Sequence, residues 1–446
     1  MRMEEFVFPE KVLYILEELE KYGEGYLVGG SVRDILLGRE VHDFDFCTNL
    51  SYETLKQIFS KYFCIETGKA FGVLRLRIDG EEFEIASFRS EKGSDGRRPE
   101  EVIFVKRIEE DLARRDFSIN AMAYNQEKGL LDYYDAQKDL ENKVIRFIGN
   151  PRERIQEDGL RIMRAFRFMS QLGFSLESNT KKAIMEEKGM LGKIAKSRIT
   201  EEWNKLILGD FVVETLEEMK KTGVLELILP SLKSLYHFNQ NNPYHSYDLW
   251  EHTMQVVKSV PKDLDLRLAA IFHDIGKPLT KTIDEKTGYY HFYGHEKKGA
   301  ERIRSILQEE LEESNKTRKE VEFLIENHMI LHRNSSEKGI KKLISHFGIE
   351  RTEKLIKLSI ADNLGKNLQQ LRENNVADLF YKIVEKQKIP TLQELAIDGF
   401  ALMKLGYQGK EIQKIKEYLL NEILEGKIEN KETALLSKAK ELHLKS

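Results

Sequence analysis

The stretch Tyr26-Leu-Val-Gly-Gly-Ser-Val-Arg-Asp-Ile-Leu-Leu-Gly38 decides how the N-terminal part of this chain folds. Its apolar start predicts a strand that ends at two glycines, and Ser31 is placed to cap the helix that follows. The glycines let the backbone approach a phosphate, and a helix start adds free N–H groups with the positive end of its dipole. Arg33, in the first turn, offers a fork of donors that can grip a triphosphate oxygen. The last glycine of the stretch would end the helix.

The chain continues to His42-Asp-Phe-Asp-Phe46, which supplies negative charge. In a strand, residues two apart face the same side, so we expect Asp43 and Asp45 to project together while Phe44 and Phe46 enter the core. Two adjacent carboxylates repel each other, but they suit Mg²⁺, which prefers oxygen ligands and bridges to substrate phosphates. A solvated turn is the alternative for such a pair alone, and its position shortly after the glycine turn favours the metal.

The composition bounds the class of protein. The chain has 446 residues, 41% of them hydrophobic and 33% charged, which predicts a soluble globular protein of about two to four domains. It shows no apolar run near the roughly 20 residues of a membrane span, and its start is no signal peptide. Two cysteines favour a reducing cytoplasm. A net charge of −4 leaves any nucleic-acid binding to local basic patches.

The first 140 residues mix helix and strand signals, and the rest reads as helix after helix. The elements expected in the first part are helices over 10–21 and 51–62, strands over 71–78 and 82–88, and a mobile loop over 90–99. Ser51 would cap the second helix, and Asp79-Gly80 is a two-residue hairpin turn. Glu84, on the second hairpin strand, would be either a third carboxylate of the metal site or a solvent-facing residue.

Arg114-Arg-Asp-Phe-Ser-Ile-Asn-Ala-Met-Ala123 is the second chemical element. The paired guanidinium groups of Arg114 and Arg115 suit phosphate or ribose contacts, and Asn120 adds an amide that both donates and accepts hydrogen bonds. A surface ion-pair patch is the alternative for this segment alone.

The third element is Arg154-Ile-Gln-Glu-Asp-Gly-Leu-Arg-Ile-Met-Arg-Ala-Phe-Arg167. Asp158, Arg161 and Arg164 are three apart on an expected helix, so they would be near neighbours, with surface salt bridges as the alternative. Cytosine and adenine each present an amino donor beside a ring-nitrogen acceptor, whereas uracil and guanine present a carbonyl and an N–H. A carboxylate and a guanidinium, such as Asp158 with Arg161, would therefore accept C and A and refuse U and G. Arg167 lies about half a turn away, so spacing alone does not place it at the base.

These three motifs, in this order, resemble the head and neck motifs of bacterial class II tRNA nucleotidyltransferases, over roughly residues 22–225. This family contains the CCA-adding enzymes and the bacterial poly(A) polymerases. The resemblance implies an α+β fold, with a polymerase-β-like nucleotidyltransferase head followed by all-α neck, body and tail domains that hold the tRNA acceptor arm and 3′ end. It implies addition or repair of the 3′-terminal CCA from CTP and ATP, with release of pyrophosphate.

The resemblance also assigns roles to the residues of the motifs. Asp43 and Asp45 would be catalytic and bind Mg²⁺. Gly30, Arg33 and Arg115 would hold the triphosphate. The full set of nucleotide-binding residues expected in this way is Gly30, Arg33, Arg114, Arg115, Asn120, Asp158, Arg161, Arg164 and Arg167, in which Asp158 and Arg161 read the base and the last two assist.

Two further segments bear on which nucleotides are added. Asp95-Gly-Arg-Arg-Pro99 resembles the flexible loop with which CCA-adding enzymes switch from C to A. Residues 395–406 are similar to their C-terminal segment, which argues against a pure poly(A) polymerase. CC-only addition, A-only addition and poly(A) synthesis stay open within the same family, and so does the oligomeric state.

A separate group of histidines and aspartates resembles the pattern of HD metal-dependent phosphohydrolases. Its members are His252, His273, Asp274, His295, His328 and Asp362. Imidazoles and carboxylates on different helices can converge on one cation, and imidazole suits a transition metal such as Ni²⁺, Mn²⁺ or Zn²⁺. An HD phosphohydrolase, as a second activity or the main one, is the alternative function, and an inactive scaffold also stays open. The expected domains are a head over 1–140, a neck over 141–225, an HD body over 226–370 and a tRNA-binding tail over 371–446.

Overall fold

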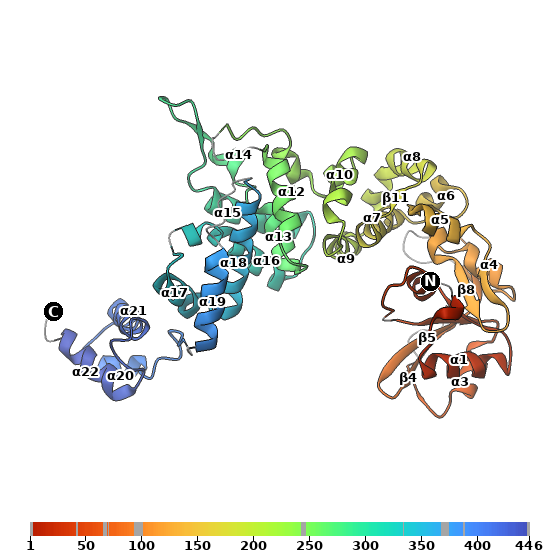
Figure 1. Ribbon diagram of the computed structural model, residues 1–446, viewed down its shortest axis with the longest axis horizontal. Helices are drawn as coiled ribbons and strands as arrows, with labels where there is room; N and C mark the ends of the chain where they lie inside the picture. The colour runs from red at the N-terminus through yellow and green to blue at the C-terminus, as the bar shows by residue number, and fades with distance from the viewer. Residues whose placement is uncertain are drawn as a thin grey trace. The chain divides into compact units, whose positions relative to one another are not determined.

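The computed structural model describes residues 3–41, 43–65, 69, 71–92, 101–241, 247–332, 334–366, 374–386 and 389–443. The chain divides into two compact units, Met1–Ile228 and Leu229–Ser446. Strands gather in the N-terminal part of the first unit, and helices make up most of the second (Figure 1). The loop predicted to switch nucleotides, Asp95–Pro99, lies outside the described residues.

A seven-stranded sheet forms the centre of the first unit, in the order β3-β4-β5-β2-β1-β8-β9. Its strands are β1 (Gly25–Val28), β2 (Asp45–Thr48), β3 (Phe63–Ile65), β4 (Val73–Ile78), β5 (Glu81–Ser87), β8 (Met122–Asn125) and β9 (Gly129–Asp132). β2 pairs antiparallel with β1 and parallel with β5, so the carboxylate-bearing strand lies inside the sheet. Tyr26 and Val28 of β1 pack with Cys47 of β2 in a buried apolar cluster that fixes these strands.

Helices cover the sheet and continue beyond it. Those of the first unit are α1 (Glu10–Glu20), α2 (Gly30–Leu36), α3 (Tyr52–Ile58), α4 (Ile108–Ala113), α5 (Ala136–Asn142), α6 (Pro151–Glu157), α7 (Leu160–Leu172), α8 (Ser178–Glu187), α9 (Lys196–Ile207), α10 (Val212–Thr222) and α11 (Leu225–Ile228). Short 3₁₀ turns lie at η1 (Met3–Glu5), η3 (Ser118–Asn120) and η4 (Lys188–Lys193), and β10 (Val144–Ile145) pairs with β11 (Ser175–Leu176).

The hairpin and the capped helix predicted from sequence are confirmed. Asp79 and Gly80 both have positive φ, 46° and 86°, as a tight hairpin turn between β4 and β5 requires. Ser51 caps α3 by accepting a hydrogen bond from the backbone N–H of Thr54. The predicted end of that helix is wrong, because α3 stops at Ile58 and not at residue 62.

The predicted loop over 90–99 begins too early. Residues 89–92 form β6 (Arg89–Lys92), which pairs antiparallel with β7 (Glu101–Phe104). Backbone hydrogen bonds to β7 override the turn-forming composition of this segment, as pairing often overrides local propensity. Residues 93–100 lie outside the described part of the chain.

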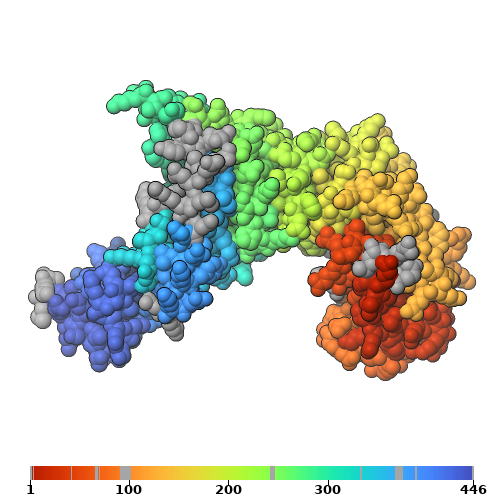
Figure 2. Space-filling model, in the orientation of Figure 1, coloured from red at the N-terminus to blue at the C-terminus, as the bar shows by residue number. Residues whose placement is uncertain are grey.

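The described residues of the second unit form helices and one small hairpin. Its elements are η5 (Pro230–Leu235), α12 (Leu249–Ser259), α13 (Leu264–Phe272), α14 (Lys277–Thr280), β12 (Thr282–Ile283), β13 (Tyr290–His291), α15 (His295–Glu309), α16 (Asn315–Asn327), η6 (Ile330–His332), α17 (Glu337–Phe347), α18 (Ile349–Leu364), α19 (Asn374–Lys386), α20 (Gly399–Lys404), α21 (Lys410–Leu424) and α22 (Glu432–His443). The hairpin of β12 and β13 forms the green protrusion beside α14, which the space-filling view shows as well (Figures 1 and 2).

Two apolar clusters organise the C-terminal half of the second unit. One joins α17, α18 and α19 around Phe380, and the other joins α20, α21 and α22 around Leu419. The predicted fold class, an α+β head followed by helical domains, is confirmed. None of the described helices is long and apolar enough to cross a membrane.

Candidate active site and candidate metal centre

The glycine turn brings the backbone against an arginine. Gly29 has φ 75° and precedes α2 as its N-cap, so the predicted cap at Ser31 is wrong. The Ser31 hydroxyl instead donates to the Val28 carbonyl at 3.0 Å, which ties the turn to the strand before it. A Cβ added at Gly29 would lie 2.8 Å from Nη1 of Arg115. Glycine is therefore required at this position both for the backbone conformation and for the approach of the guanidinium.

The carboxylate strand is shorter than the sequence predicted. β2 begins at Asp45, because Val28 opposite it is the last residue of β1 before the chain turns away at the glycines. The prediction that Asp43 and Phe44 belong to the strand is therefore wrong. Asp43 is exposed just before the strand, and Phe44 is half-buried.

Asp45 has a second carboxylate beside it. Glu84 of β5 is its partner in the parallel register, and Glu84 also pairs with Arg75 at 2.7 Å. Burial, followed by the Glu84 charge, raises the pKa of Asp45. The charge of the adjacent Glu84 carboxylate disfavours ionisation of Asp45, and a divalent cation would offset the repulsion between these two groups. The register places Glu84 beside Asp45, but its side chain is 46% exposed and paired with Arg75, so a metal role for Glu84 stays a prediction.

One cavity of about 690 Å³ in the first unit joins these features. Every residue that the sequence predicted to bind nucleotide lines this cavity, and so does Asp45. The volume lies within the usual range of small-molecule sites. Residues from the glycine turn to α7, far apart in the chain, are therefore brought together at a single place.

Arg33, in α2, is hydrogen-bonded to Asn120. The guanidinium of Arg33 donates through Nη1 to Asn120 Oδ1 at 2.6 Å and through Nε and Nη2 to both carboxylate oxygens of Asp34, at 2.9 and 2.8 Å. The Cζ atom of the Arg33 guanidinium lies 5.3 Å from the ring centroid of Phe168 on α7. The guanidinium plane is fixed before any ligand binds, which lowers the entropy lost on binding.

The paired arginines share one buried acid. Asp111 of α4 is fully buried, and it accepts from Arg114 Nε at 3.0 Å and from Arg115 Nη2 at 3.5 Å. Arg114 and Arg115 are themselves less than one quarter exposed, so a surface ion-pair patch does not describe them. Sequence reasoning did not select Asp111, although it precedes the arginines by three and four positions.

Asp116 is a second residue that sequence reasoning missed, and it contacts two of the arginines that the sequence predicted to bind nucleotide. It accepts from Arg161 Nε at 2.6 Å through one oxygen and pairs with Arg164 Nε at 2.9 Å through the other. Burial alone would raise the pKa of Asp116, but Arg164 and Arg161 outweigh it and the pKa is lowered. The available signal was its position, a single acid directly after two arginines.

Asp158 does not lie on a helix with Arg161 as predicted. α6 ends at Glu157 and α7 begins at Leu160, and Asp158 between them has extended backbone. Its carboxylate accepts from the Leu160 N–H at 3.0 Å and from Arg198 Nη2 at 3.1 Å. The side chain of Asp competes for backbone donors at a helix start, which breaks the helical run at this point.

Arg167 reaches the same cavity from further along α7. Its guanidinium pairs with Glu202 of α9 at 3.1 Å and lies 4.5 Å from the centroid of the Phe168 ring. The half-turn offset from Asp158, which left Arg167 unplaced in the sequence, rested on a continuous helix that the structure does not have.

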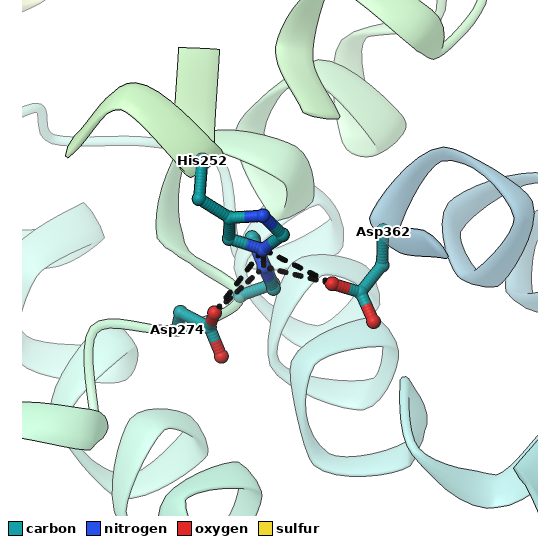
Figure 3. A group of neighbouring side chains, drawn as sticks. His252, Asp274 and Asp362 are labelled. Atoms are coloured by element: carbon teal, nitrogen blue, oxygen red, sulfur yellow. Dashed lines mark hydrogen bonds and ion pairs between the residues drawn. The ribbon is translucent and has the colours of Figure 1, made fainter. Parts of the chain in front are cut away.

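The six residues of the HD pattern converge inside the second unit. They are His252 on α12, His273 and Asp274 after α13, His295 at the start of α15, His328 after α16 and Asp362 on α18, each at most 7% exposed. His252 Nε2 lies 3.1 Å from Asp362 Oδ1 and 3.4 Å from Asp274 Oδ2 (Figure 3). The other oxygen of Asp274 lies 3.3 Å from His295 Nε2. Asp274 thus faces both possible ligand groups, one with His252 and Asp362 and one with His295 and His328.

Each of the four imidazoles is oriented by the backbone. The Nδ1 atoms of His252, His273, His295 and His328 lie 3.1, 2.9, 2.7 and 2.7 Å from the carbonyl oxygens of Gly365, Ala270, Phe292 and Ile325. A carbonyl only accepts, so Nδ1 carries a proton and Nε2 is left facing the centre as the atom that could bind a metal. This arrangement is typical of histidines that bind metal, and it fits a cation in this group.

The pKa values of two histidines in this centre are strongly shifted. Burial opposes protonation of His273, but Asp274 outweighs it and raises the pKa of His273 to about 9. Burial, together with the neighbouring histidines, lowers the pKa of His328 to about 3. Buried imidazoles and carboxylates at this density are rarely structural alone, because each is costly to bury without a partner.

Two lysines that sequence reasoning missed contact the aspartates. Lys277 Nζ lies 2.7 Å from Asp274 Oδ2, and Lys366 Nζ lies 2.6 Å from Asp362 Oδ2. Both line a cavity of about 200 Å³ that opens onto the centre. Their spacings, three residues after Asp274 and four after Asp362, were the signal in the sequence.

Comparison with known proteins matches three segments of this chain to family models. Residues 25–146 match the poly A polymerase head domain, 173–236 a probable RNA and SrmB-binding site of polymerase A, and 244–367 the HD domain. A CCA-adding enzyme of Pediococcus pentosaceus is 44% identical over 214 residues, which is 48% of this chain and 54% of the relative. One of Ligilactobacillus salivarius is 42% identical over 265 residues, 58% of this chain and 65% of the relative. The chain thus spans about half to two thirds of the length of these relatives.

Solved structures extend the likeness to nearly the whole chain. The Bacillus stearothermophilus CCA-adding enzyme in complex with CTP matches with a TM-score of 0.75 at 23% identity, covering 98% of this chain and 99% of that one. The Thermotoga maritima CCA-adding enzyme complexed with tRNA matches with a TM-score of 0.59 at 18% identity, covering 97% and 95%. At these identities the matches establish a shared fold.

Proposed function

Because this chain joins a poly A polymerase head domain to an RNA-binding segment and an HD domain, we propose that it is a template-independent tRNA nucleotidyltransferase. It adds or repairs the 3′-terminal CCA of tRNA from CTP and ATP and releases pyrophosphate. The observation that carries this proposal is the single cavity in which the glycine turn, Asp45 and the arginine motifs meet. The Pediococcus and Ligilactobacillus relatives that carry the name CCA-adding enzyme support it.

The triphosphate is held by the glycine turn and the arginines. Gly29 and Gly30 at the start of α2 line the cavity, and the free N–H groups of a helix start can bind an anion without an intervening side chain. Arg115, which lies against the turn, and Arg33, held by Asp34 and Asn120, add charge-assisted hydrogen bonds.

Asp43, Asp45 and the neighbouring Glu84 are the residues that would hold Mg²⁺. A divalent cation supplies Lewis-acid stabilisation of the charge that develops on the phosphate oxygens. In the reaction the 3′-oxygen of the tRNA forms a bond to the α-phosphorus, and the bond from that phosphorus to pyrophosphate breaks. The carboxylates orient the acceptor end, while Arg33 and Arg115 stabilise the leaving pyrophosphate.

The base is read by groups that keep hydrogen-bonding capacity in the free protein. Each carboxylate oxygen of Asp158 has two lone pairs, so the contacts with Leu160 and Arg198 leave room for a base amino group. Arg161 uses Nε and Nη1 toward Asp116, Glu157 and the Arg154 carbonyl. Its Nη2 is then the group that donates to the ring nitrogen of cytosine or adenine.

A panel of nucleotides tests this function. The protein is incubated with Mg²⁺ and a tRNA that ends at the discriminator base, with CTP, ATP, UTP or GTP singly and with CTP and ATP together. We expect two additions with CTP alone and three with both. A tRNA ending in CC is tested in parallel: its extension by ATP, without any addition of C to the shorter tRNA, would identify an A-adding enzyme. A halt after two additions with both nucleotides present would identify a CC-adding enzyme. Long A tracts would identify a poly(A) polymerase.

A second function is favoured by the metal centre of the second unit. We propose that this centre binds a transition metal, Ni²⁺, Mn²⁺ or Zn²⁺, and hydrolyses a 2′,3′-cyclic or terminal phosphate. Water oxygen forms a bond to phosphorus, the bond from phosphorus to a ribose oxygen breaks, and that oxygen takes a proton. Clearing such ends would prepare damaged tRNA for the head. Hydrolysis of 2′,3′-cyclic AMP with each metal in turn tests the proposal, and no activity with any metal would reduce the domain to a scaffold.

A further inference from the structure

The small cavity above the metal centre has two chemically different ends. Its inner end is formed by ligand residues and by Lys277 and Lys366, which favours an anionic group such as a phosphate. Its remaining lining consists of Met329 and one continuous stretch of aromatic residues, 290–293. A cavity with lysines at one end and aromatic rings at the other complements a single nucleotide, which carries a phosphate group and a flat base.

Phe292 and Tyr293 have different surroundings within this stretch. Phe292 packs against Phe238 with ring centroids 5.9 Å apart, and Lys277 Nζ lies 5.6 Å from the centroid of the Phe292 ring. These contacts anchor the loop. Tyr293 is 78% exposed, and its ring stacks on that of His291 with centroids 5.2 Å apart and planes 14° apart. An exposed ring already stacked on one partner offers a flat surface at the rim of the cavity.

The backbone holds this pair close to the metal centre. Tyr293 is two residues before the ligand His295, and Gly294 between them has φ 77°, which turns the chain into α15. The carbonyl of Phe292, next to Tyr293, accepts from Nδ1 of His295 at 2.7 Å. The position of the stacked pair is therefore linked to that of the ligand.

We propose that Tyr293, stacked on His291, binds the base of the nucleotide whose phosphate the HD centre hydrolyses. The inference rests on the proposed phosphohydrolase activity and names its substrate class, a 2′,3′-cyclic or terminal phosphate on a nucleoside rather than on a base-free sugar. Stacking on an aromatic side chain is tolerant of base identity, so the site accepts any tRNA 3′ end.

The test compares two substrates that differ only in the base. Wild type and Tyr293→Ala are assayed with Mn²⁺ on 2′,3′-cyclic AMP and on methyl riboside 2′,3′-cyclic phosphate. Loss of one stacked base should lower kcat/KM for cyclic AMP by roughly five- to a hundred-fold, mainly through KM, and leave the base-free substrate unchanged. Tyr293→Phe should restore wild-type values. Tyr289→Ala is the matched control, because Tyr289 is an exposed tyrosine of the same hairpin and is not among the cavity-lining residues.

An equal loss on both substrates, or no loss on either, would overturn the inference. The same comparison of wild type with Tyr293→Ala is made on an oligonucleotide ending in a 2′,3′-cyclic phosphate, for which we expect a similar loss of kcat/KM. If wild type hydrolyses neither substrate, the phosphohydrolase proposal fails on its own, and titration calorimetry with Mn²⁺-loaded protein decides the inference. Tighter binding of adenosine 3′-monophosphate than of ribose 3-phosphate, lost in Tyr293→Ala, supports a base site, and equal affinities contradict it.

Discussion

Arg161 Nε donates to the carboxylate of Asp116 at 2.6 Å, and this contact fixes the guanidinium in the wall of the cavity. The second oxygen of Asp116 holds Arg164. A single acid therefore positions two of the arginines that line the cavity.

Replacing this acid should loosen base selection. In Asp116→Asn we expect the preference for CTP over UTP to fall at least tenfold, and the free energy of unfolding to fall by about 3 kcal/mol because two guanidinium groups lose a partly buried charged partner. Single-nucleotide incorporation and urea denaturation measure the two effects. Asp139→Asn is the matched control, since Asp139 is a buried acid of the head that pairs with Arg146 away from the cavity. If both variants lost the same selectivity, the effect would be general destabilisation.

The same ion pairs predict a pH dependence. The folded-state pKa of Asp116 is lowered, so its stabilising contribution is present above the ordinary aspartate pKa of about 3.9 and is lost as pH falls through the folded value. The difference in unfolding free energy between wild type and Asp116→Asn should be constant from about pH 5 to 8 and shrink below about pH 4. A difference that grows with falling pH would contradict this assignment.

Arg161 itself should contribute more to the discrimination between CTP and UTP than to the affinity for CTP. In Arg161→Ala the triphosphate contacts of Arg33 and Arg115 remain, so we expect CTP binding to weaken little while the preference for CTP over UTP collapses. A site built to hydrogen-bond a base edge rejects the wrong edge by leaving buried groups unpaired. KM and kcat for CTP and UTP separate the two effects. Full retention of the CTP preference would leave Asp158 and Arg161 as ion-pair residues only.

The glycine turn offers a test that separates backbone strain from contact. Gly29→Ala places a Cβ 2.8 Å from Arg115 at positive φ, so it should lower stability by about 1–2 kcal/mol and also raise KM for both CTP and ATP. Gly38→Ala has a similar φ, 65°, with nothing within 4 Å of its Cβ, so only the stability loss is expected. Thermal unfolding and steady-state kinetics compare them. An unchanged KM in Gly29→Ala would remove Arg115 from the triphosphate site.

The two proposed active centres should act independently. His273→Ala with Asp274→Ala removes two ligand residues of the second unit, and we expect transition-metal-dependent phosphohydrolase activity to be lost. CCA addition with Mg²⁺ should survive, because the proposed Mg²⁺ ligands are carboxylates of the first unit. Both activities are measured on the same preparation, with circular dichroism to check folding. Loss of CCA addition in a folded double variant would show that the centres are coupled.

Local patterns predicted the elements, and long-range pairing decided where they end. The alternating strands around Asp79-Gly80 and the cap at Ser51 were readable because turns and caps depend on a few adjacent residues. The start of β2 at Asp45 was not, because it depends on where β1 runs out opposite it. The break before α7 was hidden as well, since Asp158 acts as a backbone acceptor in the middle of an apparently continuous helical pattern.

For the two sites, the main arginines, histidines and aspartates could be predicted from the sequence, but the residues that contact and orient them could not. The arginines and histidines stood out by number and order, so every predicted nucleotide-binding residue lies on one cavity and all six residues of the HD pattern converge. Asp116 and Lys366 remained unselected, because an ordinary acid or lysine gains meaning only from the groups that folding places beside it. The roles of all these residues remain predictions.

The central claim is that the cavity beside Asp45 builds the tRNA 3′ end, and one measurement tests it most directly. A tRNA lacking CCA is incubated with Mg²⁺, CTP and ATP, and the added nucleotides are sequenced for wild type and Asp45→Asn. Asparagine is nearly isosteric but lacks the charge that a Mg²⁺ ligand needs, so tRNA binding should persist in the variant. We predict addition of C, C and A in that order by wild type and none by Asp45→Asn. Undiminished addition by the variant, or no addition by wild type, would contradict the account.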